Sequence, residues 1–329
     1  MRTLLLLCCA LVIGSGTNFA QAPVVTDVLA AQVMLDRAGF SSGEIDGRTG
    51  ANTRRAITAF QQSQGLPGTG ILDQATWQRL SERAGNEPPL TAYVVGDADL
   101  TGPFTPDIPA DLMEQSKLKA LGYQSALEAI GETFHSSPAL LRQLNRGATF
   151  ERAGEEIMVP NVTVVELPAP VAARARGRGR ASTPVGTSGT APAPDVTIYV
   201  TKATSALTVE DAAGTVLFHA PVTSGSEHDP LPIGSWNVTM VQRMPAFNYN
   251  PDLFWDANPT HSKARIPPGP NNPVGTVWID LTKEHYGIHG APEPSRIGHT
   301  QSHGCVRLTN WDVARVAQWA RPGTPVIFR

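Results

Sequence analysis

Residues 302–308 read Ser-His-Gly-Cys-Val-Arg-Leu, and residues 288–290, one loop earlier, read Ile-His-Gly. These two stretches place His289 and His303 near Cys305 in the sequence. A thiol is a strong nucleophile only as the thiolate, and an imidazole can accept its proton. If the second stretch is a strand, residues 303, 305 and 307 share one face, because side chains alternate with period two. The pattern predicts a nucleophilic site.

Glycines flank the reactive positions on both stretches. Gly290 follows one histidine and Gly304 precedes the cysteine, so substrate could approach bare backbone and amide N–H groups could face a developing oxyanion. Residue chemistry leaves three interpretations open: a nucleophile, an inert or intermolecularly bridged thiol, and a zinc ligand. The zinc set would be Cys305 with His285, His289, His299 and His303. Its spacing matches no familiar paired pattern, and no H-E-x-x-H helix accompanies it.

Length and charge restrict the class of protein. A chain of 329 residues predicts two or three domains. A formal net charge of −3 argues against nucleic acid as the main partner.

The N-terminus predicts export. A positive start and an apolar run lead to small residues, which is typical of a cleaved signal peptide over residues 1–22. The run is too short to span a bilayer, so we expect no integral membrane segment after cleavage. Cys8 and Cys9 lie in this run and would leave with it. Cys305 would then have no partner for a disulfide within its own chain.

Residues 24–82 predict a small three-helix domain. Apolar residues recur at helical spacing, Thr26 or Asp27 can cap the first helix, and Thr49 or Asn52 the second. A generic helical bundle would satisfy this pattern. The ordered set also resembles the peptidoglycan-binding domain of cell-wall enzymes. It comprises Ile45-Asp46-Gly47, Thr53, Ala56, Phe60-Gln61, Gly65-Leu66 and Thr76.

The next segments are less regular. Residues 83–120 are rich in Pro, Asp and Gly and predict a connection with weak structure. Residues 121–163 contain two helical patterns, with Ser137-Pro138 as a start signal, and then an apolar run. This order resembles the lysin motif, a βααβ glycan-binding module, although its first strand is not evident. The alternative is a helical hairpin that serves as a spacer. Residues 164–194 predict a flexible linker of Arg, Gly and Pro.

Residues 195–329 predict a β-rich domain. Short apolar runs are separated by turn residues, with a hairpin turn at Ala213-Gly214. Residues 244–273 are long and rich in Pro and Asn, as expected of a functional lid, and carry the aromatic residues Tyr249 and Trp255. Asn310 is expected to cap a helix before the final strand.

This last domain resembles the L,D-transpeptidase catalytic domain, particularly its Gram-negative branch. The resemblance rests on the two opening stretches and on Ile297-Gly298, Pro232-Ile233-Gly234, residues 268–275 and residues 323–326. Ala291 departs from the threonine that this branch often has there. The implied fold is a mixed β-sandwich with a lid. The whole chain is thus expected to be multidomain α+β, with a three-helix bundle and a βααβ-like module before the sandwich.

The resemblance implies roles for the site residues. Cys305 would be the nucleophile, His289 the proton carrier and the Gly290 carbonyl the group that orients it. Gly304 would contribute to an oxyanion hole, with Ser302 and His303 in support. The expected substrate-binding residues are Arg307, Tyr249 and Trp255. No metal or cofactor is expected.

The expected function is therefore a periplasmic L,D-transpeptidase of cell-wall synthesis and cell shape. It would act on peptidoglycan, both glycan strands and stem peptides, to form 3→3 cross-links, or attach a wall lipoprotein as acceptor. The alternatives are an L,D-carboxypeptidase that uses the same site with water, and a non-catalytic wall-binding protein.

Overall fold

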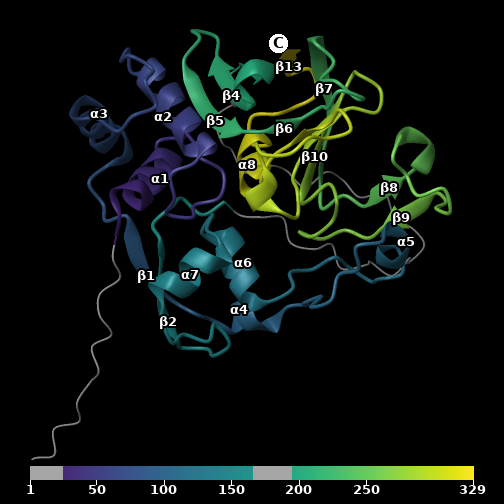
Figure 1. Ribbon diagram of the computed structural model, residues 1–329, viewed down its shortest axis with the longest axis horizontal. Coiled ribbons are helices and arrows are strands. Elements are labelled where there is room, and N and C mark those ends of the chain that lie inside the picture. The colour runs from purple at the N-terminus through teal and green to yellow at the C-terminus, as the bar shows by residue number, and fades with distance from the viewer. Residues whose placement is uncertain (1–24, 166–194) are drawn as a thin grey trace, which may run out of the picture.

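The computed structural model describes residues 25–165 and 195–329. The predictions of a signal peptide over 1–22 and of a linker over 164–194 lie outside the described residues, except for residues 164 and 165. Helical modules occupy the N-terminal half and a large β-rich domain the C-terminal half, as Figure 1 shows. The multidomain α+β prediction is confirmed. In the described ranges, no helix is long and apolar enough to cross a membrane.

The N-terminal domain is a bundle of three helices: α1 (Asp27–Arg37), α2 (Ala51–Ser63) and α3 (Gln74–Ala84). Their apolar faces meet around Phe40 and Phe60, whose rings contact edge to face at 5.4 Å. Thr26 caps α1 as predicted, but the prediction for α2 was wrong. Gly50 precedes α2 without a side-chain cap, because the amide of Asn52 donates instead to the Ile297 carbonyl of the β-rich domain.

The second module has the order βααβ. Its elements are β1 (Leu90–Val94), α6 (Ala126–Thr133), α7 (Pro138–Leu144) and β2 (Glu156–Pro160). β1 pairs with β2 in antiparallel register. The first strand therefore lies in the segment 83–120 that was expected to be a weakly structured connection. The run Tyr93-Val94-Val95 is strand-like in the sequence, but its partner lies more than sixty residues later, so local pattern does not show that it pairs. Two short helices, α4 (Asp97–Thr101) and α5 (Leu112–Gln115), are inserted after it.

The β-rich domain contains nine hydrogen-bonded strands in the order β5-β4-β3-β13-β7-β10-β11-β12-β6. Their bounds are β3 (Val196–Thr201), β4 (Ala206–Asp211), β5 (Val216–Pro221), β6 (Thr223–Ser224), β7 (Gly234–Arg243), β10 (Val277–Leu281), β11 (Gly287–His289), β12 (Val306–Arg307) and β13 (Pro325–Phe328). The long strand β7 joins two parts of this sheet. Its first half pairs with β13 and its second half with β10.

One helix, α8 (Asn310–Val316), packs against the sheet core (Figure 1). All seven of its residues are buried. The prediction that Asn310 caps this helix was wrong: the cap is Thr309, whose hydroxyl accepts the Asp312 N–H. Asn310 is the first helical residue, and its side chain is free to bind elsewhere.

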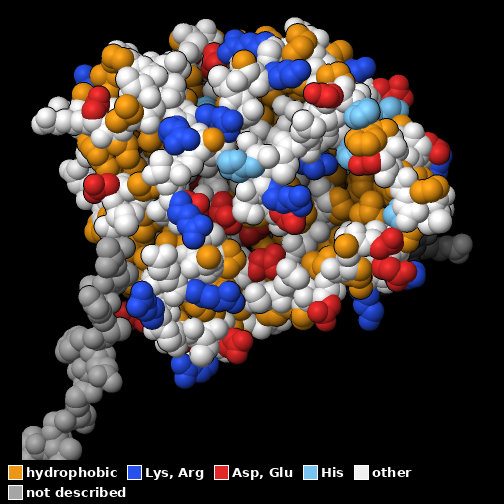
Figure 2. All heavy atoms as spheres, in the orientation of Figure 1, with side chains coloured by type: hydrophobic (Ala, Val, Ile, Leu, Met, Phe, Trp, Pro, Cys, Tyr) orange, Lys and Arg blue, Asp and Glu red, His pale blue; other side chains and the backbone are white. Residues whose placement is uncertain are grey.

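The helical modules dock directly on the β-rich domain. Phe40 forms a β-bridge with His219 of β5, and Ser41 donates to the Asp312 carboxylate of α8. A buried ion pair joins Asp36 of α1 to Arg315 of α8 at 2.8 Å. Figure 2 shows acidic side chains gathered in the hollow between the helical modules and the β-rich domain. These contacts make the upstream modules part of one packed unit with the C-terminal domain.

Candidate active site

Two neighbouring strand ends bring the predicted residues together. β11 and β12 run parallel, with His289 opposite Arg307 and Ile288 opposite Val306. This register places Cys305 beside Gly287, and because side chains alternate, residues 289, 305 and 307 face the same side. All three line one cavity of about 780 Å³. The loop between residues 289 and 305 thus folds back and brings the histidine and the cysteine to the same cavity.

His289 is held in one orientation. Its Nδ1–H donates to the Gly290 carbonyl at 2.7 Å, since a carbonyl can only accept. Its ring stacks on the ring of Trp278, with the two ring centroids 5.2 Å apart, and His289 is 3% exposed. Burial, and then the nearby Arg307 charge, lower the pKa of His289 to about 3. The imidazole is therefore neutral, with Nε2 available as a proton acceptor.

Cys305 is half-buried and is a free thiol. Burial raises its pKa above the ordinary value, and a backbone N–H and the Arg307 charge oppose this shift without cancelling it. Its Sγ lies 3.7 Å from the His285 carbonyl. The cavity therefore holds a neutral thiol and a neutral imidazole, so a thiolate could form there only by transfer of the thiol proton.

The loop before the cysteine is rigidly supported. The Ser302 hydroxyl donates to the Cys305 carbonyl at 2.6 Å and accepts the Gly225 N–H at 2.7 Å. Gly304 has a φ of +99°, and a methyl group placed there would lie 2.5 Å from the Tyr286 ring. Only glycine fits this position without strain. The backbone amides next to the thiol consequently have a fixed direction.

Arg307 lines the cavity with a guanidinium that has one unpaired N–H group. Its Nε is buried and has no hydrogen-bond partner among the described residues. Burial lowers the pKa of its guanidinium from the ordinary value. A buried N–H group without an acceptor is costly, and an incoming carboxylate would relieve that cost.

A hairpin of β8 (Phe247–Tyr249) and β9 (Ala264–Ile266) forms the predicted lid. The lid reaches the site through Asp256, which pairs with His303 Nε2 at 2.7 Å. Tyr249 lines the cavity and bonds through its hydroxyl to His261 at 3.1 Å. Trp255 is 60% exposed and stacks on His228 at 4.2 Å, outside the cavity lining.

The sequence reasoning missed a contribution from the upstream module. Leu112 of α5 lines the same cavity, and Asp111 accepts from His261 Nε2 at 3.0 Å. The segment inserted after β1 therefore supports the lid. Its four-residue helix lies in a Pro- and Asp-rich run, so no periodic signal could have indicated this contact.

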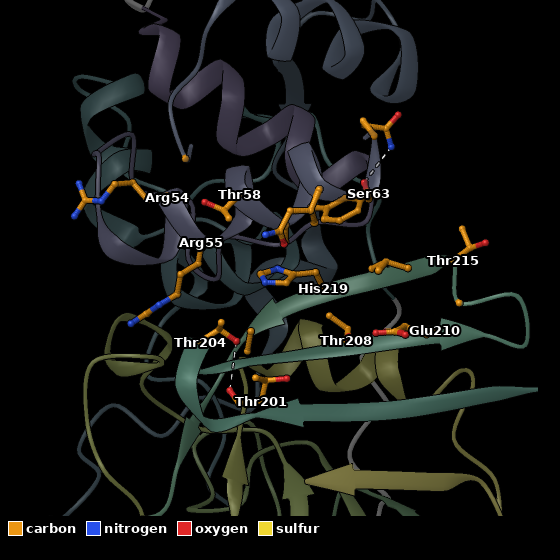
Figure 3. A pocket seen from close by; sticks show the side chains of 18 of the residues that line it. Arg54, Arg55, Thr58, Ser63, Thr201, Thr204, Thr208, Glu210, Thr215 and His219 are labelled. Carbon is orange, nitrogen blue, oxygen red and sulfur yellow. Dashed lines mark hydrogen bonds between the residues drawn. The ribbon is translucent and has the colours of Figure 1, made fainter. Parts of the chain in front are cut away.

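A second, larger cavity of about 1050 Å³ lies between the bundle and the β-rich domain. Figure 3 shows Arg54, Arg55 and Thr58 of α2 on one side of it and Thr208 and Glu210 of β4 on the other. Its lining contains no thiol, and its histidine, His219, is buried with a pKa lowered to about 4 by that burial. Of these two cavities, the smaller one therefore has the thiol and the imidazole that the sequence analysis singled out.

The described ranges contain no group of three or more His, Cys, Asp or Glu side chains placed to hold a metal ion. The five residues considered as zinc ligands therefore form no such group, although four of them line the same cavity.

Comparison with known proteins divides the chain in the same way. Residues 195–328 match the L,D-transpeptidase catalytic domain family, and residues 25–80 match the putative peptidoglycan binding domain family. The L,D-transpeptidase match extends over nearly all of the β-rich domain. Upstream of it, the chain carries a peptidoglycan-binding-type domain.

Individual relatives agree over shorter stretches. The putative L,D-transpeptidase YkuD of Bacillus licheniformis is 48% identical over 59 residues, which is 18% of this chain and 36% of that protein. The putative L,D-transpeptidase YqjB of Bacillus subtilis is 30% identical over 113 residues, which is 32% of this chain and 56% of that protein. The probable L,D-transpeptidase YbiS of Escherichia coli is 40% identical over 65 residues, which is 20% of this chain and 21% of that protein. The chain thus spans less than two thirds of each relative.

Among solved structures, an L,D-transpeptidase from Mycobacterium smegmatis is similar at 20% identity and a TM-score of 0.34. The match covers 41% of this chain and 58% of that one.

Proposed function

We propose that this protein is a periplasmic L,D-transpeptidase that works through a Cys305 acyl-enzyme on peptidoglycan tetrapeptide stems. It would form 3→3 cross-links, or attach a lipoprotein to the wall. The observation that carries the proposal is the convergence of Cys305, His289 and Arg307 on one cavity wall beneath a lid. A nucleophile, a neutral base held by a carbonyl and a cation for a carboxylate suit acyl transfer on an anionic peptide.

The first half-reaction follows from the neutral pair. Cys305 Sγ attacks the carbonyl carbon between the diamino acid at position three and the terminal D-alanine, while His289 Nε2 takes the thiol proton. The oxyanion that develops faces the amides around Gly304. Collapse breaks the C–N bond, and the imidazolium returns its proton to the departing D-alanine amine. A thioester remains on Cys305.

The second half-reaction consumes the thioester. An acceptor amine attacks its carbonyl, gives a proton to His289 and displaces the sulfur, which recovers that proton. The acceptor is the side-chain amine of a second stem or of a lipoprotein lysine. Water in the same place would give an L,D-carboxypeptidase.

Arg307 would bind a substrate carboxylate. Its buried Nε has no partner among the described residues, and a carboxylate there would complete a charge-assisted pair. The same charge lowers the pKa of both His289 and Cys305, so substrate that neutralises it would make His289 a better base.

Product analysis tests the proposal. The protein freed of residues 1–22 is incubated with purified disaccharide tetrapeptides, and Cys305→Ala serves as the inactive control. Cross-linked dimers support transpeptidation, and tripeptide alone supports the carboxypeptidase. Absence of turnover in the wild type would leave a non-catalytic wall-binding role.

Covalent labelling tests the nucleophile separately. A carbapenem is expected to acylate the wild type one to one and to leave Cys305→Ala unlabelled, as read by intact mass. Labelling that persists in the variant would refute the assignment of Cys305.

A further inference from the structure

Asn310 is a junction between the βααβ module and the active site. It is fully buried at the start of α8. Its Oδ1 accepts the Thr276 N–H at 3.0 Å, and its Nδ2 donates to the Pro270 carbonyl at 3.1 Å. The other Nδ2 hydrogen is directed to the carboxylate of Glu132, at 2.9 Å from Oε1 and 3.2 Å from Oε2. The Asn310 amide therefore has one orientation that satisfies all of its bonds.

This amide packs against the residue that orients the catalytic histidine. A methyl group placed on Gly290 would overlap Asn310 Oδ1, and one on Gly275 would overlap the same atom. Gly290, Gly275 and Asn310 therefore touch without spare room. The Gly290 carbonyl in turn accepts the His289 Nδ1–H at 2.7 Å. A rotation of the Asn310 amide would have to move Gly290, and with it the acceptor that holds the imidazole.

Glu132 comes from α6 of the upstream module, 178 residues before Asn310. Its side chain is 6% exposed, and the Tyr123 hydroxyl donates to it at 3.4 Å. It does not line the substrate cavity. Burial of a carboxyl group costs free energy in any protonation state, which points to a role other than stability.

We propose that Glu132 is a positioning residue for the transpeptidase reaction. By fixing the Asn310 amide it keeps the Gly290 carbonyl directed at His289 Nδ1, so the βααβ module completes the active site by docking on it. This inference deepens the proposed function and rests on it only for the role of His289 as the base.

The main variant is Glu132→Ala. It leaves one Asn310 Nδ2 hydrogen without an acceptor, so the amide can turn and Gly290 can shift. A misplacement of about 1 Å can cost on the order of 100-fold in rate. We expect kcat to fall about 10- to 100-fold with KM nearly unchanged. Glu132→Gln keeps an oxygen acceptor for Asn310 and should stay within about threefold of the wild type.

Glu128→Ala is the matched control. Glu128 lies on the same helix, carries the same side-chain type and also reaches the C-terminal domain, where it accepts from Asn271 Nδ2 at 2.8 Å. Asn271 is not among the atoms that a methyl group on Gly290 would meet. This variant should keep kcat near the wild-type value.

A readout that needs no substrate separates positioning from structural damage. In protein with ¹⁵N-labelled histidine, His289 should appear as the single Nδ1–H tautomer in the wild type, in Glu128→Ala and in Glu132→Gln. Glu132→Ala should show a tautomer mixture or a displaced Nδ1–H resonance. If Glu132→Ala does not fold, Glu132→Asp replaces it, because it keeps the carboxyl group and withdraws it by one methylene.

The outcomes are distinct. A changed His289 tautomer together with a loss of kcat in the Ala or Asp variant, restored by Gln, supports the proposal. A loss of kcat with an unchanged tautomer, or equal losses in Glu128→Ala, overturns it. If wild-type protein turns over no peptidoglycan substrate but the tautomer still responds to Glu132, the positioning holds and the proposed function fails.

Discussion

The buried ion pair between Asp36 and Arg315 should account for a large part of the adhesion between the N-terminal bundle and the β-rich domain. The two side chains are 1% and 10% exposed, and their N–O distance is 2.8 Å. Asp36 also bonds to buried His135 at 3.0 Å. Removal of one partner leaves an uncompensated buried charge, which costs about 3–5 kcal/mol. We therefore expect Asp36→Ala to lower the free energy of unfolding by about that amount.

A surface pair provides the control. Arg296 and Glu293 are closer, at 2.7 Å, but they are 61% and 59% exposed. Exposed pairs are worth about 0–1 kcal/mol, so Glu293→Ala should have little effect. The shorter distance would make the surface pair the stronger one, whereas burial makes the Asp36–Arg315 pair the stronger one. We expect burial to determine which variant loses more unfolding free energy.

Urea denaturation followed by tryptophan fluorescence is the assay. Trp311 is buried and stacks on His135 at 5.3 Å, so it reports on this interface directly. The double variant Asp36→Ala/Arg315→Met should lose less unfolding free energy than the two single variants together, because neither charge is left buried without its partner. The reasoning is refuted if Asp36→Ala costs no more than Glu293→Ala.

The pH dependence of this loss has a definite sign. Burial would raise the pKa of Asp36, but Arg315 and then His135 outweigh it and hold that pKa well below its usual range. A depressed carboxyl pKa stabilises the fold at pH values above the unfolded pKa of about 4 and loses this effect as the pH falls further. The gap between the wild type and Asp36→Ala should therefore narrow below about pH 4.

Three further predictions concern the site and its supports. Gly304→Ala should nearly abolish carbapenem labelling while folding is retained, because the added methyl meets the Tyr286 ring at a positive φ; labelling at the wild-type rate would contradict this. His261→Ala removes the lid's bonds to Asp111 and Tyr249, about 1 kcal/mol each, so hydrogen exchange over residues 247–266 should accelerate up to about 30-fold, and unchanged exchange would count against it. Burial raises the pKa of Glu132 to about 8, so its contribution to stability is greatest below pH 4.5 and is lost as the pH rises through 8. The melting temperature of Glu132→Gln should therefore rise relative to that of the wild type between these two pH values.

Much of the architecture could be predicted from local pattern. Helical spacing and caps such as Thr26 and Ser137 identified the N-terminal bundle and α7, and alternation with turn residues identified the hairpin at residues 213–214. These signals are local, because caps and periodicity act within a few residues of the chain. The place of β1 in the βααβ module could not be predicted in this way, because a short strand-like run becomes a strand only with a partner, and here that partner is β2.

For the candidate site as well, some features follow from the sequence and others only from the tertiary structure. The sequence by itself determined which residues could do the chemistry, because a thiol, two imidazoles and flanking glycines are recognisable by type and spacing. Their common cavity depends on the parallel register of β11 and β12, which no single stretch specifies. The neutrality of His289 and Cys305 is likewise a property of burial, which requires the assembled core.

Only the tertiary structure decided how the upstream modules meet the site. Asn310 looked like a helix cap in the sequence, yet its amide binds Glu132, and Leu112 and Asp111 belong to the wall and the lid supports of the cavity. Contacts across more than a hundred residues depend on shape and on the pairing of buried polar groups. The chain sequence specifies such contacts only after every element has packed, because an unpaired buried group is costly only once water has been excluded.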